Sequence, residues 1–97
     1  MAPRLISILP ARGVTGKKLV ATFRVNGRIK KVRFGATGYS DYTVHKDDRR
    51  KQAYIARHKT GENWDDPLTA GALSRWVLWN KPTLAASIRD YRERFGL

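Results

Sequence analysis

The amino-acid sequence predicts an α+β fold, in which an N-terminal extended arm and a β-hairpin are followed by two or three short α-helices packed on the apolar face of the hairpin. Three observations support this class. A chain of 97 residues suffices for one hydrophobic core. An Asn-Gly pair separates two runs of alternating apolar and polar residues, and the second half repeats its apolar residues at helical spacing. We therefore expect an extended basic arm over residues 1–18 and a single small domain over residues 19–97.

The arm is expected to be extended because two prolines and two glycines within it oppose a regular helix. The short apolar run from Leu5 to Leu9 is predicted to anchor the arm on the domain or on a neighbouring molecule, and an additional edge strand is the alternative. This run is shorter than the ~7–15 residues of a signal-peptide core and the ~20 residues of a membrane span. We therefore expect no membrane insertion.

The hairpin is predicted from Leu19–Val25 and Arg28–Phe34, which flank Asn26-Gly27. This dipeptide suits a two-residue type I′ turn, whose central residues both need positive φ. With that turn, alternate residues place most of the large apolar side chains on one face. The opposite face holds Val20, Thr22, Arg24, Ile29, Lys31 and Arg33 and is therefore largely basic.

Helices are predicted in the remainder of the chain from capping residues and apolar spacing. Asp41 begins a short helical turn through His45, and Asp47 caps a helix over about residues 48–59. A third segment runs from about Thr69 to Trp79. Thr83 caps a last helix through Phe95, whose expected buried stripe is Leu84, Ile88, Tyr91 and Phe95.

The charge pattern excludes an ordinary neutral domain. The chain has 20 Lys and Arg against 8 Asp and Glu, a net charge of +12, and its first 34 residues contain no carboxylate. Binding to a polyanion or an acidic surface is the expected consequence. Because the side chains that read bases are scarce, we expect phosphate contacts with little base specificity. The predicted binding residues are Arg12, Lys17, Lys18, Arg24, Arg28, Lys30, Lys31, Arg33, Arg49, Arg50, Lys51 and Arg57.

The aromatic residues have two interpretations each. Trp64, Trp76 and Trp79 are expected to form core or a contact with a partner protein, because tryptophan is enriched at interface hot spots. Tyr39 and Tyr42 are expected to pack against the hairpin, and stacking on unpaired bases is the alternative.

Signs of catalysis are few. The sequence has no Gly-rich phosphate loop and no paired-histidine helix, and the absence of cysteine excludes a disulfide or a Cys-ligated zinc. His45 and His58 could converge with Asp41, Asp47 or Asp48 in a metal-dependent nuclease. We instead expect Asp47 and Asp48 to serve the helix terminus. The prediction is a non-enzymatic protein without metal, cofactor or small-molecule substrate.

Several motifs resemble a family of small basic uncharacterised proteins encoded by large nucleocytoplasmic DNA viruses of algae and protists. They are GYSDYTVHKD over residues 38–47, RKQAYIARH over 50–58, ENW over 62–64 and LWNKPTL over 78–84, together with the strand end Lys31–Gly35. The resemblance covers about residues 28–91. It implies a viral origin and a place in the virion, and it implies no catalytic residue.

Together these observations favour a non-enzymatic structural protein of a large DNA virus particle, as a minor capsid or inner-face component that grips an acidic protein surface or the genome. Its expected partners are viral capsid proteins, double-stranded DNA or both. Its expected locations are the virion and, during assembly, the host cytoplasm. The alternative is a free, sequence-independent nucleic-acid-binding protein of the viral factory, and a small metal-dependent nuclease is a remote third.

Overall fold

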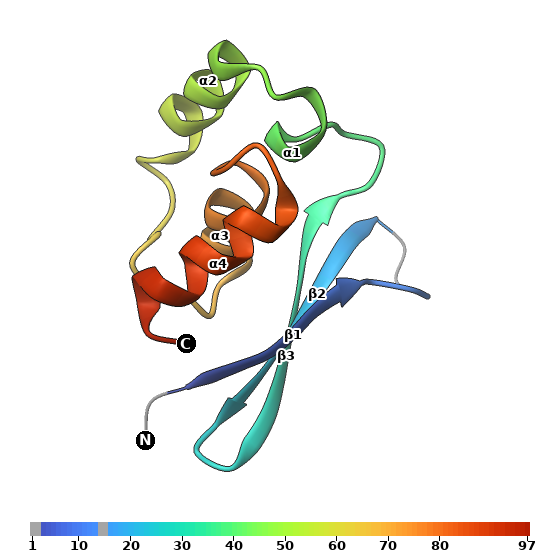
Figure 1. Cartoon of the computed structure of the whole chain (residues 1–97), viewed down its shortest axis with the longest axis vertical. Coiled ribbons are helices and arrows are strands. Elements are labelled where there is room, and N and C mark those ends of the chain that lie inside the picture. The colour runs from blue at the N-terminus through green and yellow to red at the C-terminus, as the bar shows by residue number, and fades with distance from the viewer. Residues whose placement is uncertain (1–2, 14–15) are drawn as a thin grey trace.

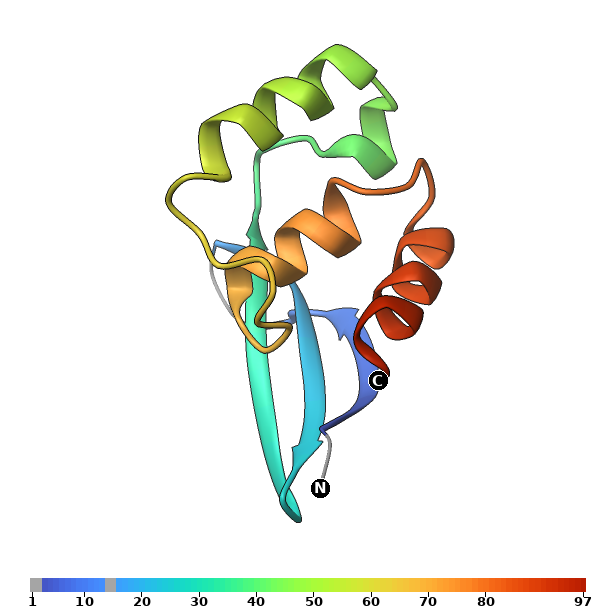
Figure 2. The ribbon, with the colours of Figure 1, turned by 90° about the vertical axis from the view of Figure 1, so that its left-hand side faces the viewer.

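The computed structural model describes residues 3–13 and 16–97, which form one sheet and a group of short helices (Figure 1). The antiparallel sheet has the order β1-β2-β3. The helices lie on one side of the sheet, as the perpendicular view also shows (Figure 2). No helix in the described ranges is long and apolar enough to cross a bilayer. In chain order the elements are β1 (Arg4–Pro10), β2 (Lys17–Val25), β3 (Arg28–Ala36), α1 (Tyr42–His45), α2 (Asp48–His58), α3 (Ala70–Leu73), the π-helix η1 (Ser74–Leu78) and α4 (Leu84–Phe95).

The predicted hairpin is confirmed with its register. Asn26 and Gly27 have φ angles of 51° and 79°, as a type I′ turn requires. Phe23 pairs with Lys30 and Leu19 pairs with Phe34, so the apolar and basic faces are divided as alternation predicts. Both strands extend two residues beyond the predicted limits, because the backbone ladder continues to the pairing of Lys17 with Ala36.

The N-terminal segment forms a third strand rather than a separate arm. β1 pairs with β2 from Arg4 to Pro10, with a bulge between Leu5 and Ser7. The edge-strand alternative is therefore the one observed, and Lys17 and Lys18 likewise belong to the sheet. Leu5 supplies a physical reason, since it is buried opposite Phe23 while the backbone on both sides of it joins the ladder. Residues 1–2 and 14–15 of the predicted arm lie outside the described residues.

The core lies between the inner face of the sheet and the helices of the second half. Phe23 and Phe34 from the hairpin pack into one cluster with Leu73, Val77 and Tyr91. The Tyr91 hydroxyl donates a hydrogen bond to the Pro67 carbonyl, so its polar end is satisfied in the core. These contacts confirm that helices cover the apolar face of the hairpin.

The predicted helices are confirmed at their N-termini. The side chains of Asp41, Asp47, Thr69 and Thr83 each accept a hydrogen bond from a backbone N–H of the helix that follows. The third segment divides into α3 and η1, a division that the apolar spacing did not indicate.

The prediction that Leu84 belongs to the buried stripe on α4 is wrong. Leu84 is 37% exposed, whereas Ser87 is fully buried. Ser87 is held there because its hydroxyl bonds both the backbone N–H and the carbonyl of Lys81. The first turn of α4 therefore meets the preceding loop through a polar contact.

Gly35 occupies a position where a side chain would meet both backbone strain and a neighbour. Its φ is +78°, and an added Cβ would lie 2.8 Å from Leu78 Cδ1. Gly35→Ala is expected to lower the free energy of unfolding by about 1–3 kcal/mol, measured by urea denaturation. Gly38→Ala is the matched control, because Gly38 has a φ of +84° and open space around it. Equal losses in the two variants would show that the contact with Leu78 contributes nothing.

Candidate nucleic-acid interface and adjoining cleft

The face of the sheet turned away from the helices, here called the outer face, carries a group of exposed cations. Arg24, Lys31 and Arg33 alternate with the buried residues of β2 and β3, so all three project from this face. β1 adds Arg4, which pairs with Arg24. No described helix covers this side of the sheet (Figure 1). The strand that sequence analysis described as an arm thus enlarges the basic surface.

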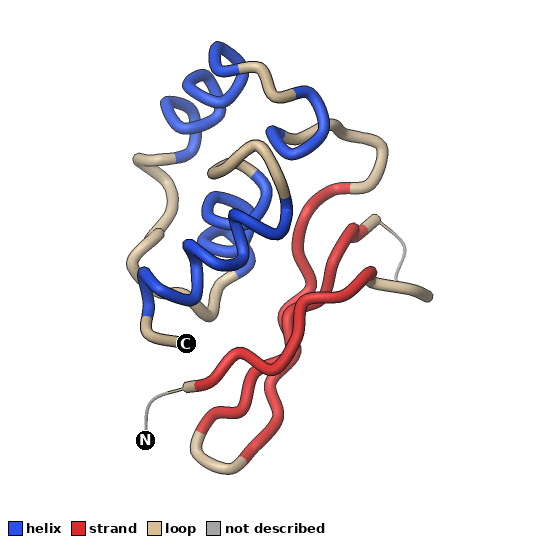
Figure 3. The backbone as a smooth tube through the Cα atoms, in the orientation of Figure 1, coloured by secondary structure: helices blue, strands red, loops and turns tan. Residues whose placement is uncertain are grey.

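The hairpin end adds cations on the other face. Arg28 and Lys30 have the same alternation as the core residues, yet both are exposed. Figure 3 shows the reason, since the turn between β2 and β3 projects beyond the helices. The protruding end of the hairpin is therefore basic on both faces.

The outer-face and hairpin-end cations are not neutralised within the described part of the chain. The ion pairs found there are Lys18–Asp41 at 2.7 Å, His58–Glu62 at 3.3 Å and Arg94–Asp90 at 3.3 Å. Of the predicted binding residues, only Lys18 takes part in one of these pairs. The positive field of the sheet is thus directed at solvent, where it can attract an anionic partner.

The structure divides the predicted binding residues on α2. Lys51 turns inward, donates to the Asn80 carbonyl at 2.7 Å and lies 4.8 Å from the centre of the Tyr42 ring. Burial, with the nearby charge of Arg75, lowers the pKa of Lys51. Arg49 is exposed on α2, and Arg12 is exposed between β1 and β2. The twelve predicted residues therefore do not form one continuous track.

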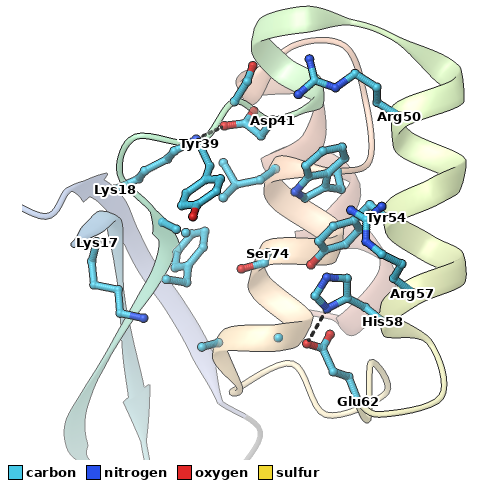
Figure 4. A pocket seen from close by; sticks show the side chains of 18 of the residues that line it. Lys17, Lys18, Tyr39, Asp41, Arg50, Tyr54, Arg57, His58, Glu62 and Ser74 are labelled. Atoms are coloured by element: carbon cyan, nitrogen blue, oxygen red, sulfur yellow. Dashed lines mark hydrogen bonds and ion pairs between the residues drawn. The ribbon is translucent and has the colours of Figure 1, made fainter.

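A cleft of about 600 Å³ separates the upper end of the sheet from α2, with α3 and η1 along its floor (Figure 4). Arg50 and Arg57 line it from α2, and Lys17 lines it from β2.

Tyr39 stands at the cleft and is 75% exposed, so it does not pack against the hairpin as predicted. Tyr42 is buried instead, and its hydroxyl donates to Asp48 at 2.6 Å. That hydrogen bond raises the pKa of Tyr42, with further contributions from burial and the Asp48 charge.

A row of stacked rings forms the wall of the cleft on the side of α2. The Tyr54 ring lies between Trp79, at 4.4 Å and nearly parallel, and His58, at 4.3 Å. His45 and Tyr42 continue the row beyond Trp79. Contacts between such rings stabilise their arrangement beyond simple burial. The row holds α2 against Trp79, which follows η1, and leaves the cleft open between α2 and the sheet.

The other two tryptophans also have partners within the chain. The Trp76 indole N–H donates to the Trp64 carbonyl, and the Trp64 indole N–H donates to Glu62 at 2.7 Å. The guanidinium groups of Arg75 and Arg94 lie 4.2 and 3.9 Å from the Trp76 ring centre. These contacts hold the two tryptophans half-buried, and a role at a protein interface stays a prediction.

The convergence required by the nuclease alternative is not formed among the described residues. His45 Nδ1 accepts a hydrogen bond from the Asp47 N–H, while His58 Nδ1 lies 3.3 Å from Glu62 Oε1. The rings of Trp79 and Tyr54 stand between the two histidines. Residues 3–13 and 16–97 contain no group of three or more His, Asp or Glu side chains arranged to hold a metal ion.

Alkaline pH should weaken the stacked wall. Burial raises the pKa of Tyr54 to about 12, so the folded state favours the neutral phenol. The stabilisation is present below the ordinary tyrosine pKa of 10.0 and is lost as the pH rises toward 12. We expect the free energy of unfolding to fall between pH 10 and 12, and to fall less steeply in Tyr54→Phe. Urea denaturation across this range measures the difference, and identical slopes would contradict the assignment.

Comparison with known proteins gives a family of unknown function. Residues 11–58 match a protein family described as a family of unknown function (DUF5754). The matching region extends through β2, β3, α1 and α2, and so includes the hairpin and both sides of the cleft mouth. No curated protein and no solved structure matches the chain.

Proposed function

We propose that this protein binds double-stranded DNA without sequence specificity, through the outer face of the sheet and the hairpin end. One observation carries the proposal: these exposed cations form no ion pair with a carboxylate in the described part of the chain. Exposed Lys and Arg side chains bind phosphates and release condensed counterions, which favours association with DNA. The residues that make up this surface are Arg4, Arg24, Arg28, Lys30, Lys31 and Arg33.

Base recognition has little support on this surface. The uncharged residues of the outer face are Ser7, Thr22 and aliphatic side chains such as Leu9, Val20 and Ile29, and none of these has the paired donor and acceptor of Asn or Gln, the usual partners of adenine. The hairpin end adds Asn26, which occupies the turn with a positive φ. The binding energy should therefore come from phosphates and depend weakly on sequence.

Salt dependence tests the proposal. If about four to six phosphates are contacted, the slope of log affinity against log salt should be near −4 to −5. Fluorescence anisotropy with two unrelated duplexes of equal length, between 50 and 200 mM salt, measures the slope and the sequence dependence. An affinity that is independent of salt, or that differs strongly between the duplexes, would overturn the proposal.

A second candidate is supported by the apolar residues on the same surface. Ile6, Leu9 and Ile29 are 47%, 58% and 52% exposed beside the cations. A mixture of apolar and positive side chains also fits an acidic protein surface, such as a capsid protein in the virus particle implied by the family resemblance. Quantitative proteomics of purified particles tests this candidate, and absence at structural stoichiometry would remove it.

A further inference from the structure

We propose that the cleft between the sheet and α2 is a separate binding site for a nucleotide. In this arrangement Arg57 contacts the phosphate within the positive field of Lys17 and Arg50, and the base lies between Tyr39 and the ring wall. The cleft opens on the helix-bearing side of the sheet (Figure 4), whereas the DNA surface proposed above is the outer face and the hairpin end. The two proposals therefore depend on different residues and can fail separately.

The charge of the cleft favours a phosphate. Its two carboxylates already have partners: Asp41 lies 2.7 Å from Lys18 Nζ, and Glu62 bonds Trp64 and His58. The remaining cations of the lining form no ion pair among the described residues. Figure 4 shows that they come from opposite sides, with Lys17 on the sheet and Arg50 and Arg57 on α2. Such an arrangement makes the cleft positive, and Arg57 can bind a phosphate there through charge-assisted hydrogen bonds.

The size and the aromatic lining favour a ligand larger than inorganic phosphate. A volume of about 600 Å³ falls within the range of small-molecule sites, roughly 300–1000 Å³. Tyr39 is 75% exposed and belongs to none of the ring pairs found among the described residues. Both faces of Tyr54 are covered by Trp79 and His58, so Tyr39 is the ring free to stack on a base.

Two hydroxyl groups are placed to contact the edge of a base. The Tyr54 side chain, from α2, and the Ser74 side chain, from η1 on the floor, both point into the cleft (Figure 4). The structure shows no hydrogen bond from either hydroxyl to another described residue. A few convergent polar groups beside aromatic surface are typical of a specific small-ligand site. A phosphorylated peptide side chain would use the cations but would leave this part of the cleft unfilled.

Calorimetric titration of 5′-dAMP into the whole chain tests the site, with deoxyadenosine and inorganic phosphate as separate probes. We expect dAMP to bind at least tenfold more tightly than either probe, because only dAMP uses both the cations and the aromatic surface. No detectable dAMP binding would overturn the proposal. Equal affinity for inorganic phosphate and dAMP would also overturn it, because the cleft would then be an anion site only.

Substitutions in the cleft test whether dAMP binds there. Arg57→Gln and Tyr39→Ala should each weaken dAMP binding about tenfold, the loss expected for one charged hydrogen bond or one stacking contact. Lys59→Gln is the matched control, since Lys59 is exposed beside the same helix end and does not line the cleft. Unchanged unfolding midpoints show that the variants fold. Wild-type affinity in both cleft variants would overturn the proposal.

Two further ligands identify the source of the nucleotide. If the cleft receives an unpaired nucleotide of a strand, a duplex with a single-stranded overhang should bind more tightly than a blunt duplex, and Tyr39→Ala should abolish the gain. If it receives a free nucleotide, dAMP should bind while the overhang adds nothing. In either case, serine substitutions of Arg24, Lys31 and Arg33 should leave dAMP affinity unchanged, and a parallel loss would show that the two sites are one.

Discussion

Replacing Arg24, Lys31 and Arg33 together by serine is expected to lower duplex DNA affinity on the order of 10²-fold at 0.1 M salt. All three side chains are exposed on the outer face, and none forms an ion pair in the described part of the chain. Each lost phosphate contact reduces the salt slope by about 0.9, so three contacts reduce it by about 2.7. Fluorescence anisotropy at several salt concentrations measures both quantities.

The control must distinguish the effect of the outer face on DNA affinity from the effect of total net charge. A variant with Lys59, Lys81 and Arg89 replaced by serine loses the same three charges from exposed positions outside the proposed surface. Both variants should fold with nearly unchanged stability, because exposed charges contribute little to it. We expect the control to retain most of the affinity and the wild-type slope. Equal losses would mean that total charge, rather than the outer face, is responsible for binding.

Phe23→Ala is expected to lower the free energy of unfolding by about 3–5 kcal/mol. Phe23 is fully buried in the cluster that joins the sheet to α3, η1 and α4, and it pairs with Leu5 of β1. The variant loses the buried ring and leaves a cavity lined by these elements. A domain of this size is stable by only about 5–15 kcal/mol, so much of its stability would be lost.

Urea denaturation followed by circular dichroism measures the Phe23 effect. Ile29→Ala is the control, because Ile29 is 52% exposed on the outer face of β3. It should change stability by less than about 1 kcal/mol. If Phe23→Ala does not fold, Phe23→Leu, which leaves a smaller cavity, should fold with a reduced unfolding midpoint. Similar losses for positions 23 and 29 would contradict the assignment of the inner face as the core face.

The elements that sequence analysis predicted correctly depend on neighbouring residues. A type I′ turn at Asn26-Gly27 sets which residues pair across the hairpin, and alternation then divides the side chains between two faces. The basic outer face of β2 and β3 follows directly from that register. The starts of α1, α2 and α4 follow from a capping side chain and the few backbone groups next to it, whereas the segment that begins with α3 was predicted from apolar spacing.

The features that sequence analysis missed depend on contacts between distant segments. Sequence analysis gave an edge strand at Leu5–Leu9 only as an alternative, because β1 contains no turn or capping signal that identifies its partner, and Leu5 joins a core that the helices complete. The inward turn of Lys51 depends on Asn80, and the exposure of Leu84 accompanies the polar contact between Ser87 and Lys81. The spacing of apolar residues describes one helix or strand at a time, and therefore it cannot predict which residues of other segments that element contacts.

The cleft depends most strongly on contacts between segments that are distant in the sequence. It combines β2, β3, the loop bearing Tyr39, α2 and the π-helix, which are separate segments of the sequence. Local spacing could place Arg50 and Arg57 on one helix, but it could not bring Lys17 or Trp79 to them. Turn chemistry, alternation and capping act within a few residues, so the chain alone specifies the hairpin, its basic face and the helix starts. The third strand and the cleft arise from packing between segments far apart in sequence, and so they become visible only when the whole chain is folded.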